Sequence, residues 1–304
     1  MISSGNRAPP PPPSHDGLGA LSLGDCPNCG ANLRGPFCSQ CGEKKLRRED
    51  YTLREVAGDV IGEFTHFDGR LIRTIVTLIR RPGELARAYF HGGRSRYTKP
   101  LTLFVIINLA FFFIQPHTGL LRYGLTQFVY PGVHSGTYKA RLVEAKLKRT
   151  GEPEDKYAIR FNAVLQDQKK SLLIFSIPVV AALMLVLFRG SGRTYVEHLV
   201  FSVHLYTFVL LYLTSLVILF IVVALFLSAF GATGRQWIHL LGSELQISVL
   251  MGAGLTVYTY HAARRVYGAR GLWMLVRAAT IAASVGYLTG VYHDVLFYAT
   301  YWST

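Results

Sequence analysis

Residues Val196–Phe230 read VEHLVFSVHLYTFVLLYLTSLVILFIVVALFLSAF, and this stretch decides the fold class. After Glu197 it contains no Asp, Glu, Lys or Arg, and no glycine, proline or asparagine interrupts it. At about 1.5 Å per residue, one helix of this length exceeds the roughly 30 Å hydrocarbon core of a bilayer. The stretch therefore predicts one transmembrane helix over 196–229 that is tilted or projects beyond the membrane.

The overall composition also indicates a membrane protein. Of the 304 residues, 50% are hydrophobic and only 16% are charged, whereas about 25% are charged in average soluble domains. Pro178 lies within one of the apolar runs, which a membrane helix tolerates. Four further apolar runs, at 97–115, 171–188, 240–261 and 272–298, predict additional spans. With 196–229 they make about five spans, in a membrane domain over 97–304.

The distribution of basic residues predicts how these spans are oriented. The chain carries 32 Lys and Arg against 18 Asp and Glu, and fifteen of the basic residues lie within residues 1–99. By the positive-inside rule the N-terminus is cytoplasmic and, with five spans, the C-terminus lies outside the inner membrane. Segment 117–170 disagrees, because it has ten basic residues, but its length weakens the rule, and we predict a small extramembrane lobe outside.

The N-terminal residues differ in character from the apolar runs. Residues 1–24 include five consecutive prolines, Pro9 to Pro13, and read as a disordered or polyproline spacer. They lack the apolar core of a secretory signal, so we expect this end to stay in the cytosol.

All four cysteines lie in the segment 25–45, DCPNCGANLRGPFCSQCGEKK. Two CxxC pairs separated by eight residues suit a tetrahedral metal site, and in a reducing cytosol clustered cysteines are metal ligands more often than disulfides. Gly30 and Gly42 follow the pairs and can take the positive φ that turns the backbone under the sulfur. We predict a structural Zn²⁺ in a zinc ribbon; redox dithiol chemistry and an iron–sulfur cluster are the alternatives. The ligands are Cys26, Cys29, Cys38 and Cys41.

Residues 50–96 have the pattern of amphipathic helices. Apolar residues recur at helical spacing from Leu53 to Phe64 and again from Leu71 to Ile79, and neither stretch is long enough to cross a membrane. Basic rims favour helices lying in the membrane interface over a soluble hairpin that buries both faces. The basic tail that follows the cysteines, Lys44 to Arg48, has no interleaved aromatic residues, so lipid headgroups are favoured over nucleic acid as its partner. The candidate membrane-surface cations are Lys44, Lys45, Arg47, Arg48, Arg80, Arg81, Arg94 and Arg96.

Three motifs together resemble a family of bacterial membrane proteins. The motifs are CPNCG…GPFCSQCGEKK, the stretch FTHFDGRLIRTIVTLIRRPGELARAYFHGGRSRYTKPLTLFVIINLAFFF and YVEHLVFSVHLYTF, which cover roughly 26–115 and 195–208. They are similar to the family grouped as domain of unknown function 3667. The resemblance implies a zinc ribbon joined to a polytopic membrane domain, and it implies no activity.

Several ionisable residues lie within or beside the predicted spans, where such groups are costly and are candidates for function. Two hypotheses stay open: that those near the cytoplasmic boundary line a polar cavity, or that they mark helix ends and pair locally. Glu197 and His204 share a helix face, whereas His198 and His204 do not. The candidate cluster consists of Glu197, His198, His204 and His261.

No GxSxG, HExxH, P-loop or GxGxxG motif is present, so we assign no catalytic residue. The sequence favours an all-α polytopic membrane protein with a small four-cysteine zinc ribbon, acting as a non-enzymatic interaction or regulatory module. Its expected partners are membrane lipids and a cytosolic protein bound through the ribbon. The alternatives are a transporter or permease component that uses the Glu/His cluster, and a membrane enzyme acting on lipid or envelope precursors.

Overall fold

The computed structural model describes residues 24–26, 28–42, 69–115, 124–129, 137–168, 172–231, 233, 236–237, 244–268 and 270–304. From Gly69 onward the described elements are all helices, and in the cysteine segment Asp25 and Asn32 form an isolated β-bridge. The all-helical fold class is thus confirmed for the part of the chain that the structure describes. The predicted tail over 1–24 and the predicted helix from Leu53 to Phe64 lie outside it, apart from Gly24.

Among the residues that the structure describes, three helical segments are long and apolar enough to cross a membrane: Arg94–Ile114, Tyr195–Ser228 and Leu272–Ser303. They comprise η2 (Arg94–Arg96) with α4 (Pro100–Ile114), then α9 (Tyr195–Ser228), then α12 (Leu272–Ser303). Helix α9 is continuous over 34 residues, as predicted, and it begins with a capping box between Thr194 and Glu197. The other two predicted spans correspond to η4 (Leu172–Phe175) with the short apolar helix α8 (Ser176–Leu187), and to α11 (Glu244–Tyr267).

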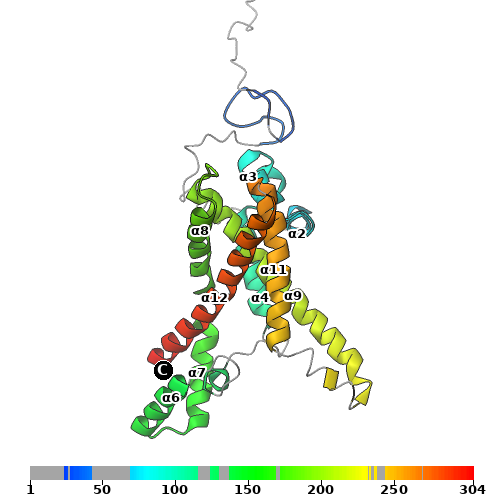
Figure 1. The fold of residues 1–304 in the computed structure, drawn as a ribbon. Helices are drawn as coiled ribbons and strands as arrows, with labels where there is room; N and C mark the ends of the chain where they lie inside the picture. Colours follow the sequence, from blue (N-terminus) through cyan, green and yellow to red (C-terminus); the bar gives the residue numbers. More distant parts are fainter. Residues whose placement is uncertain are drawn as a thin grey trace, which may run out of the picture.

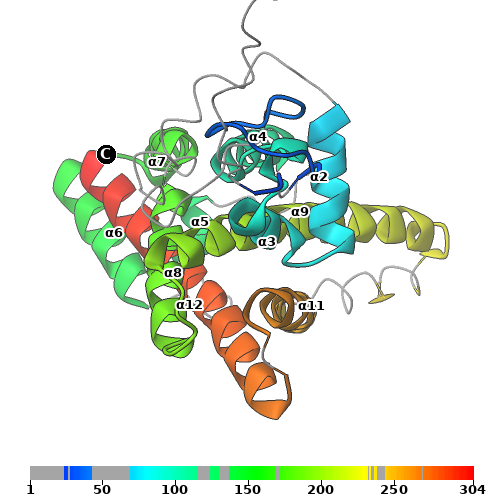
Figure 2. The same ribbon diagram turned by 90° about the horizontal axis from the view of Figure 1, so that it is seen from above.

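The five helices form one bundle (Figures 1 and 2). Helix α9 packs against α4 and α8, and α11 packs against α12. Val180 and Met184 of α8 are fully buried in the shared core. Helices α9 and α11 meet where Gly254 leaves room for Tyr212, whose hydroxyl donates to the Leu250 carbonyl at 2.9 Å.

Two short helices lie at one end of the bundle. Helix α2 (Gly69–Arg80) is seen end-on in Figure 1 and from the side in Figure 2, so it lies across the direction of α4 and α11. Helix α3 (Glu84–His91) follows after the turn at Pro82 and Gly83. This turn is fixed to α11, because Arg265 Nη1 donates to the Pro82 carbonyl at 2.8 Å.

The segment between α4 and α8 contains α5 (Leu125–Val129), α6 (Thr137–Thr150) and α7 (Glu154–Gln168). These helices pack around the last turns of α12, far along the chain. The Lys146 ammonium donates to the Tyr301 carbonyl at 2.6 Å and lies 4.4 Å from the centre of the Tyr301 ring. The buried core of this lobe consists of Leu125, Phe128, Val143, Tyr157, Phe161, Leu165, Leu296 and Phe297.

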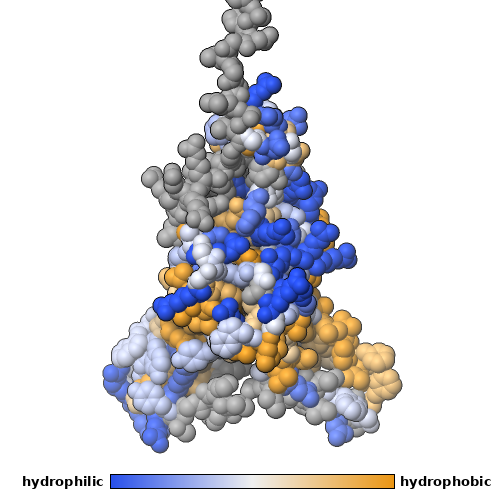
Figure 3. Space-filling view, turned by 45° about the horizontal axis from the view of Figure 1, so that its top comes forward, coloured by the Kyte–Doolittle hydropathy of each residue, from blue (hydrophilic) through white to orange (hydrophobic). Residues whose placement is uncertain are grey.

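The lobe and the cysteine segment lie at opposite ends of the molecule. Figure 1 shows residues 24–42 at the top, and α6, α7 and the end of α12 at the bottom. Figure 3 shows hydrophilic residues gathered around the end that carries α2 and α3, and hydrophobic residues exposed below them and along α9. This polarity is what a molecule that crosses a bilayer needs.

Candidate metal centre

The four cysteine sulfurs lie close enough together to share one ion. All four Sγ atoms are within 4.8 Å of one another. The Cys26–Cys41 and Cys29–Cys38 sulfur pairs are 3.6 Å and 3.5 Å apart, so neither pair is a disulfide. In a tetrahedral site with metal–sulfur bonds of ~2.3 Å, the sulfurs would be about 3.8 Å apart. The four thiols therefore fit a single metal ion, and their predicted grouping is confirmed.

The local backbone explains how the sulfurs converge. The Gly30 N–H donates to the Cys26 carbonyl and the Gly42 N–H donates to the Cys38 carbonyl, both at 2.9 Å. Gly30 and Gly42 have φ of +77° and +71°, as the sequence predicted. Leu33, only 1% exposed, packs with Cys26 and Cys38 and forms a small core under the site.

The proton affinity of the thiols bears on when a metal can bind. A backbone hydrogen bond from Ala31 lowers the pKa of the Cys29 thiol, but desolvation and hydrogen bonds with the other three thiols raise it to about 12. Four adjacent sulfurs cannot all ionise without a cation between them, since like charges would be a few ångströms apart. A metal ion that binds here must therefore displace protons.

The cysteine segment is joined to the membrane domain through Asn28, which lies between Cys26 and Cys29. The Asn28 side-chain amide donates to Ser95 Oγ at 2.8 Å, and the Arg96 guanidinium donates to the Asn28 carbonyl. Ser95 and Arg96 belong to η2, directly before α4. The cysteine cluster is therefore joined to the start of the candidate span Arg94–Ile114. Sequence reasoning missed this role of Asn28, because nothing in a CxxC loop marks which residue reaches a segment 67 positions away.

The candidate intramembrane residues have local partners. Glu197 accepts from the Thr194 N–H at 2.8 Å and pairs with Arg193 at 2.6 Å, so it caps the start of α9. The Nδ1 atom of His198 is hydrogen-bonded to the Tyr267 hydroxyl at 2.7 Å. His198 is fully buried, and its Nε2 has no partner among the described residues. These contacts fix the ends of α9 and α11 to each other.

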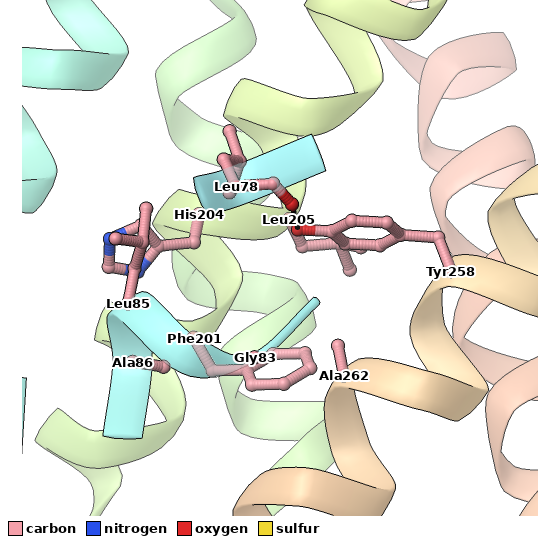
Figure 4. Close-up of a pocket in the computed structure, with 9 residues that line it drawn as sticks. All are labelled: Leu78, Gly83, Leu85, Ala86, Phe201, His204, Leu205, Tyr258 and Ala262. Carbon is pink, nitrogen blue, oxygen red and sulfur yellow. Dashed lines mark hydrogen bonds between the residues drawn. The ribbon is translucent and has the colours of Figure 1, made fainter. Parts of the chain in front are cut away.

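His204 lines a small cavity between α2, α3, α9 and α11 (Figure 4). The cavity has a volume of about 10 Å³, room for about one water molecule. Its other walls are apolar side chains and the Tyr258 ring, and Tyr258 donates to the Leu78 carbonyl at 3.2 Å. His204 Nδ1 donates to the Val200 carbonyl of its own helix at 2.9 Å.

The fourth candidate, His261, is exposed on α11. Within the described ranges, the four cysteines are the one group of three or more His, Cys, Asp or Glu side chains close enough to hold a metal. The residues Glu197, His198, His204 and His261 are therefore not brought together as a metal site.

The candidate surface cations divide into two sets. Lys44, Lys45, Arg47 and Arg48 lie outside the described residues. Arg80, Arg81 and Arg96 are exposed and Arg94 is half-buried, all at the end of the bundle that carries the cysteine segment.

Comparisons with known proteins add one finding. No curated protein and no solved structure matches this chain. The sequence model of the family described as "Protein of unknown function (DUF3667)" matches residues 68–112, which carry α2, α3, η2 and most of α4. This match confirms the family resemblance over residues 68–112, whereas the cysteine motif and residues 195–208 lie outside the matched range.

Proposed function

We propose that this protein is a membrane-embedded, non-enzymatic interaction or regulatory module, whose zinc ribbon presents a rigid surface to a cytosolic protein. The observation that carries the proposal is the closed set of four thiols seated on η2 through Asn28. A site with four protein ligands has no open position for a substrate, so its metal stabilises a fold.

The donor set supports zinc as the metal. Four thiolates in tetrahedral arrangement select zinc or iron–sulfur chemistry over Mg²⁺, Ca²⁺ or Mn²⁺. Zinc needs neither redox chemistry nor assembly with sulfide, and small Cys₄ sites of this size are its usual structural use.

The exposed side of the cysteine segment offers a contact surface. Phe37, which precedes Cys38, is 59% exposed. Aromatic residues and arginine are both enriched at protein interfaces, and Arg34 is exposed in the same loop. Asn28 provides the contact with η2, and the exposed Phe37 is the candidate contact for a partner.

We also propose five spans, with the cysteine segment in the cytoplasm and the lobe outside the inner membrane. The opposite placement of these two parts supports this topology (Figure 1). Helix α11, with 24 residues, is about 36 Å long and so reaches across a bilayer core. Helix α8 with η4 supplies 16 residues, so this span would be the shortest.

The transporter and enzyme alternatives gain no comparable support. Each of Glu197, His198 and His204 is engaged by a local hydrogen bond, and the cavity beside His204 holds about one water molecule. An enzyme site would place two titratable groups within hydrogen-bond reach of a substrate-sized pocket.

The test is photocrosslinking in cells from a benzoylphenylalanine placed at position 37 of the full-length protein. We expect one cytosolic protein to be captured reproducibly, and we expect its capture to be lost in the Cys38→Ser variant because the surface is no longer held. A crosslinker at position 302, at the far end of α12, is the control and should not capture that protein.

Metal analysis of the purified protein accompanies this test, with about one zinc per chain expected. Capture of the same protein at equal yield from Cys38→Ser, or from position 302, would contradict the proposal.

A further inference from the structure

Helix α2 carries an exposed apolar row. Ile72, Val76 and Ile79 are 69%, 43% and 51% exposed, and their spacing of four and three residues places them along one face. The opposite side of the same helix is held in the protein, because Leu78 is 2% exposed and Thr74 is fully buried. The exposed row is therefore not needed to pack α2 onto the bundle.

The position of α2 along the bundle is fixed by two hydrogen bonds. The Thr98 N–H donates to Thr74 Oγ1 at 2.9 Å, and Thr98 lies two residues before Pro100, where α4 begins. At its other end, the Leu78 carbonyl accepts from Tyr258, nine residues before the end of α11. The middle of α2 thus lies level with the first turn of a candidate span, across its direction (Figure 2).

Cations line one side of the apolar row. Arg73 and Arg80 are exposed and stand three residues before and four residues after Val76, so both are its neighbours on the helix surface. Residues 69–99 contain eight Lys or Arg and one acid, Glu84, which itself faces Arg265 at 3.8 Å. Figure 3 shows hydrophilic residues gathered at this end of the molecule, above the exposed hydrophobic residues.

We propose that α2 is an in-plane membrane anchor that binds anionic phospholipid. Ile72, Val76 and Ile79 enter the boundary between headgroups and acyl chains, while Arg73 and Arg80 bind the lipid phosphates. At the level where a span begins, an apolar helix face can contact the acyl chains while the neighbouring arginines contact the headgroup phosphates. A protein partner for this row would have to exclude lipid from a helix that lies at the membrane boundary. The inference is independent of any cytosolic partner of the cysteine segment.

The experiment uses the full-length protein in nanodiscs that contain phosphatidylcholine and phosphatidylglycerol. Benzoylphenylalanine replaces Val76, and after irradiation the lipid adducts on α2 are identified by mass spectrometry. We expect adducts with both lipids and an excess of phosphatidylglycerol over its share in the bilayer. The same crosslinker at position 37, on the cysteine segment, is the position control and should give no lipid adduct.

A second set of variants tests whether Arg73 and Arg80 bind anionic lipid, separately from the insertion of the apolar row. In R73Q/R80Q the excess of phosphatidylglycerol among the adducts should fall by about fivefold for each arginine, since a surface cation is worth about 1 kcal/mol near anionic lipid. The matched variant R141Q/R149Q removes two exposed arginines from α6 and should leave the excess unchanged. The single variants R73Q and R80Q provide the same readout if the double variant does not fold.

Two results would overturn the inference. A crosslink from position 76 to a second copy of the chain, in place of lipid, would show that protein covers the row. An unchanged phosphatidylglycerol excess in R73Q/R80Q would show that the arginines do not select anionic lipid.

Discussion

At the residue scale, the turn between α2 and α3 depends on the absence of a side chain at Gly83. Its φ of +80° is a conformation that other residues rarely adopt, and a Cβ there would lie 2.4 Å from the Ala262 carbonyl oxygen. The turn thus meets the backbone of α11 directly. This contact explains the glycine of the stretch RRPGE, which the sequence alone presents only as a helix end.

We expect Gly83→Ala to destabilise the protein by about 2–5 kcal/mol, as the sum of left-handed strain and overlap with Ala262. Gly190→Ala is the matched control, because Gly190 has φ of +87° but open space around its Cβ position. It should cost only about 1–2 kcal/mol. Unfolding in mixed detergent micelles measures the free energy of unfolding of both variants. An equal decrease in the two variants would show that the Ala262 backbone moves to accommodate the new Cβ.

Acid should release the metal, because protons compete with it for the thiols. The pKa of Cys29 without metal is raised to about 12, so binding at neutral pH releases protons and weakens as the pH falls. We expect metal content to be retained at pH 7 and lost progressively below it, and to be lost at every pH in Cys38→Ser. Metal content measured after dialysis over this range checks the direction; constant content would contradict it.

At the scale of elements, α12 belongs to two cores. Its first turns pack in the membrane bundle, with Met274 and Ile281 nearly or fully buried, whereas Leu296 and Phe297 complete the core of the lobe. The Phe297 ring contacts those of Phe128 and Phe161, with centroids 5.4 Å and 5.9 Å away. The lobe therefore cannot bury its own apolar residues without α12.

Phe297→Ala should loosen the lobe while the membrane bundle stays folded. Loss of a fully buried phenylalanine costs about 3–5 kcal/mol. Hydrogen exchange of α6 and α7 should accelerate, with α4 and α9 unaffected. Val295→Ala, at a side chain that is 47% exposed two residues away, is the control and should change neither.

The sequence predicts elements whose signal is local, and it fails where contacts join distant segments. The spacing of the four cysteines identified their cluster, and the unbroken apolar run identified α9, because each signal lies within one continuous segment of the sequence. Phe297 looked like any residue of an apolar span, because only its contacts with Phe128 and Phe161 reveal the lobe core. The contact of Asn28 with Ser95 likewise has no signature in either segment.

At the scale of the whole molecule, the two ends of α12 carry exposed tryptophans. Trp273 and Trp302 are 66% and 80% exposed and stand about 44 Å apart along the helix. This distance matches a bilayer with its headgroup regions, where tryptophan is enriched. The tryptophans thus agree with the placement of cysteine segment and lobe at opposite surfaces.

Protease protection in membrane vesicles tests this arrangement. We expect the lobe to be cleaved only in right-side-out vesicles and the cysteine segment only in inside-out vesicles. Detergent should expose both. The proposed topology places one span, 97–115, between the two parts. Cleavage of both parts from the same side would show that an even number of spans separates them and would contradict this topology.

Because α12 contributes to the core of the lobe, the lobe can complete its folding only after α12 has been synthesised. Leu165 and Leu296 lie in one core, yet the helices α8, α9 and α11 are made between them. At a synthesis rate of 5–20 residues per second, roughly 7–26 s pass between the synthesis of Leu165 and that of Leu296, which completes the core of the lobe. During that interval its apolar face is exposed to water, and only correct insertion of α12 brings Phe297 to it. The lobe therefore closes as the final step of assembly, on the condition that every preceding helix has taken its place in the membrane.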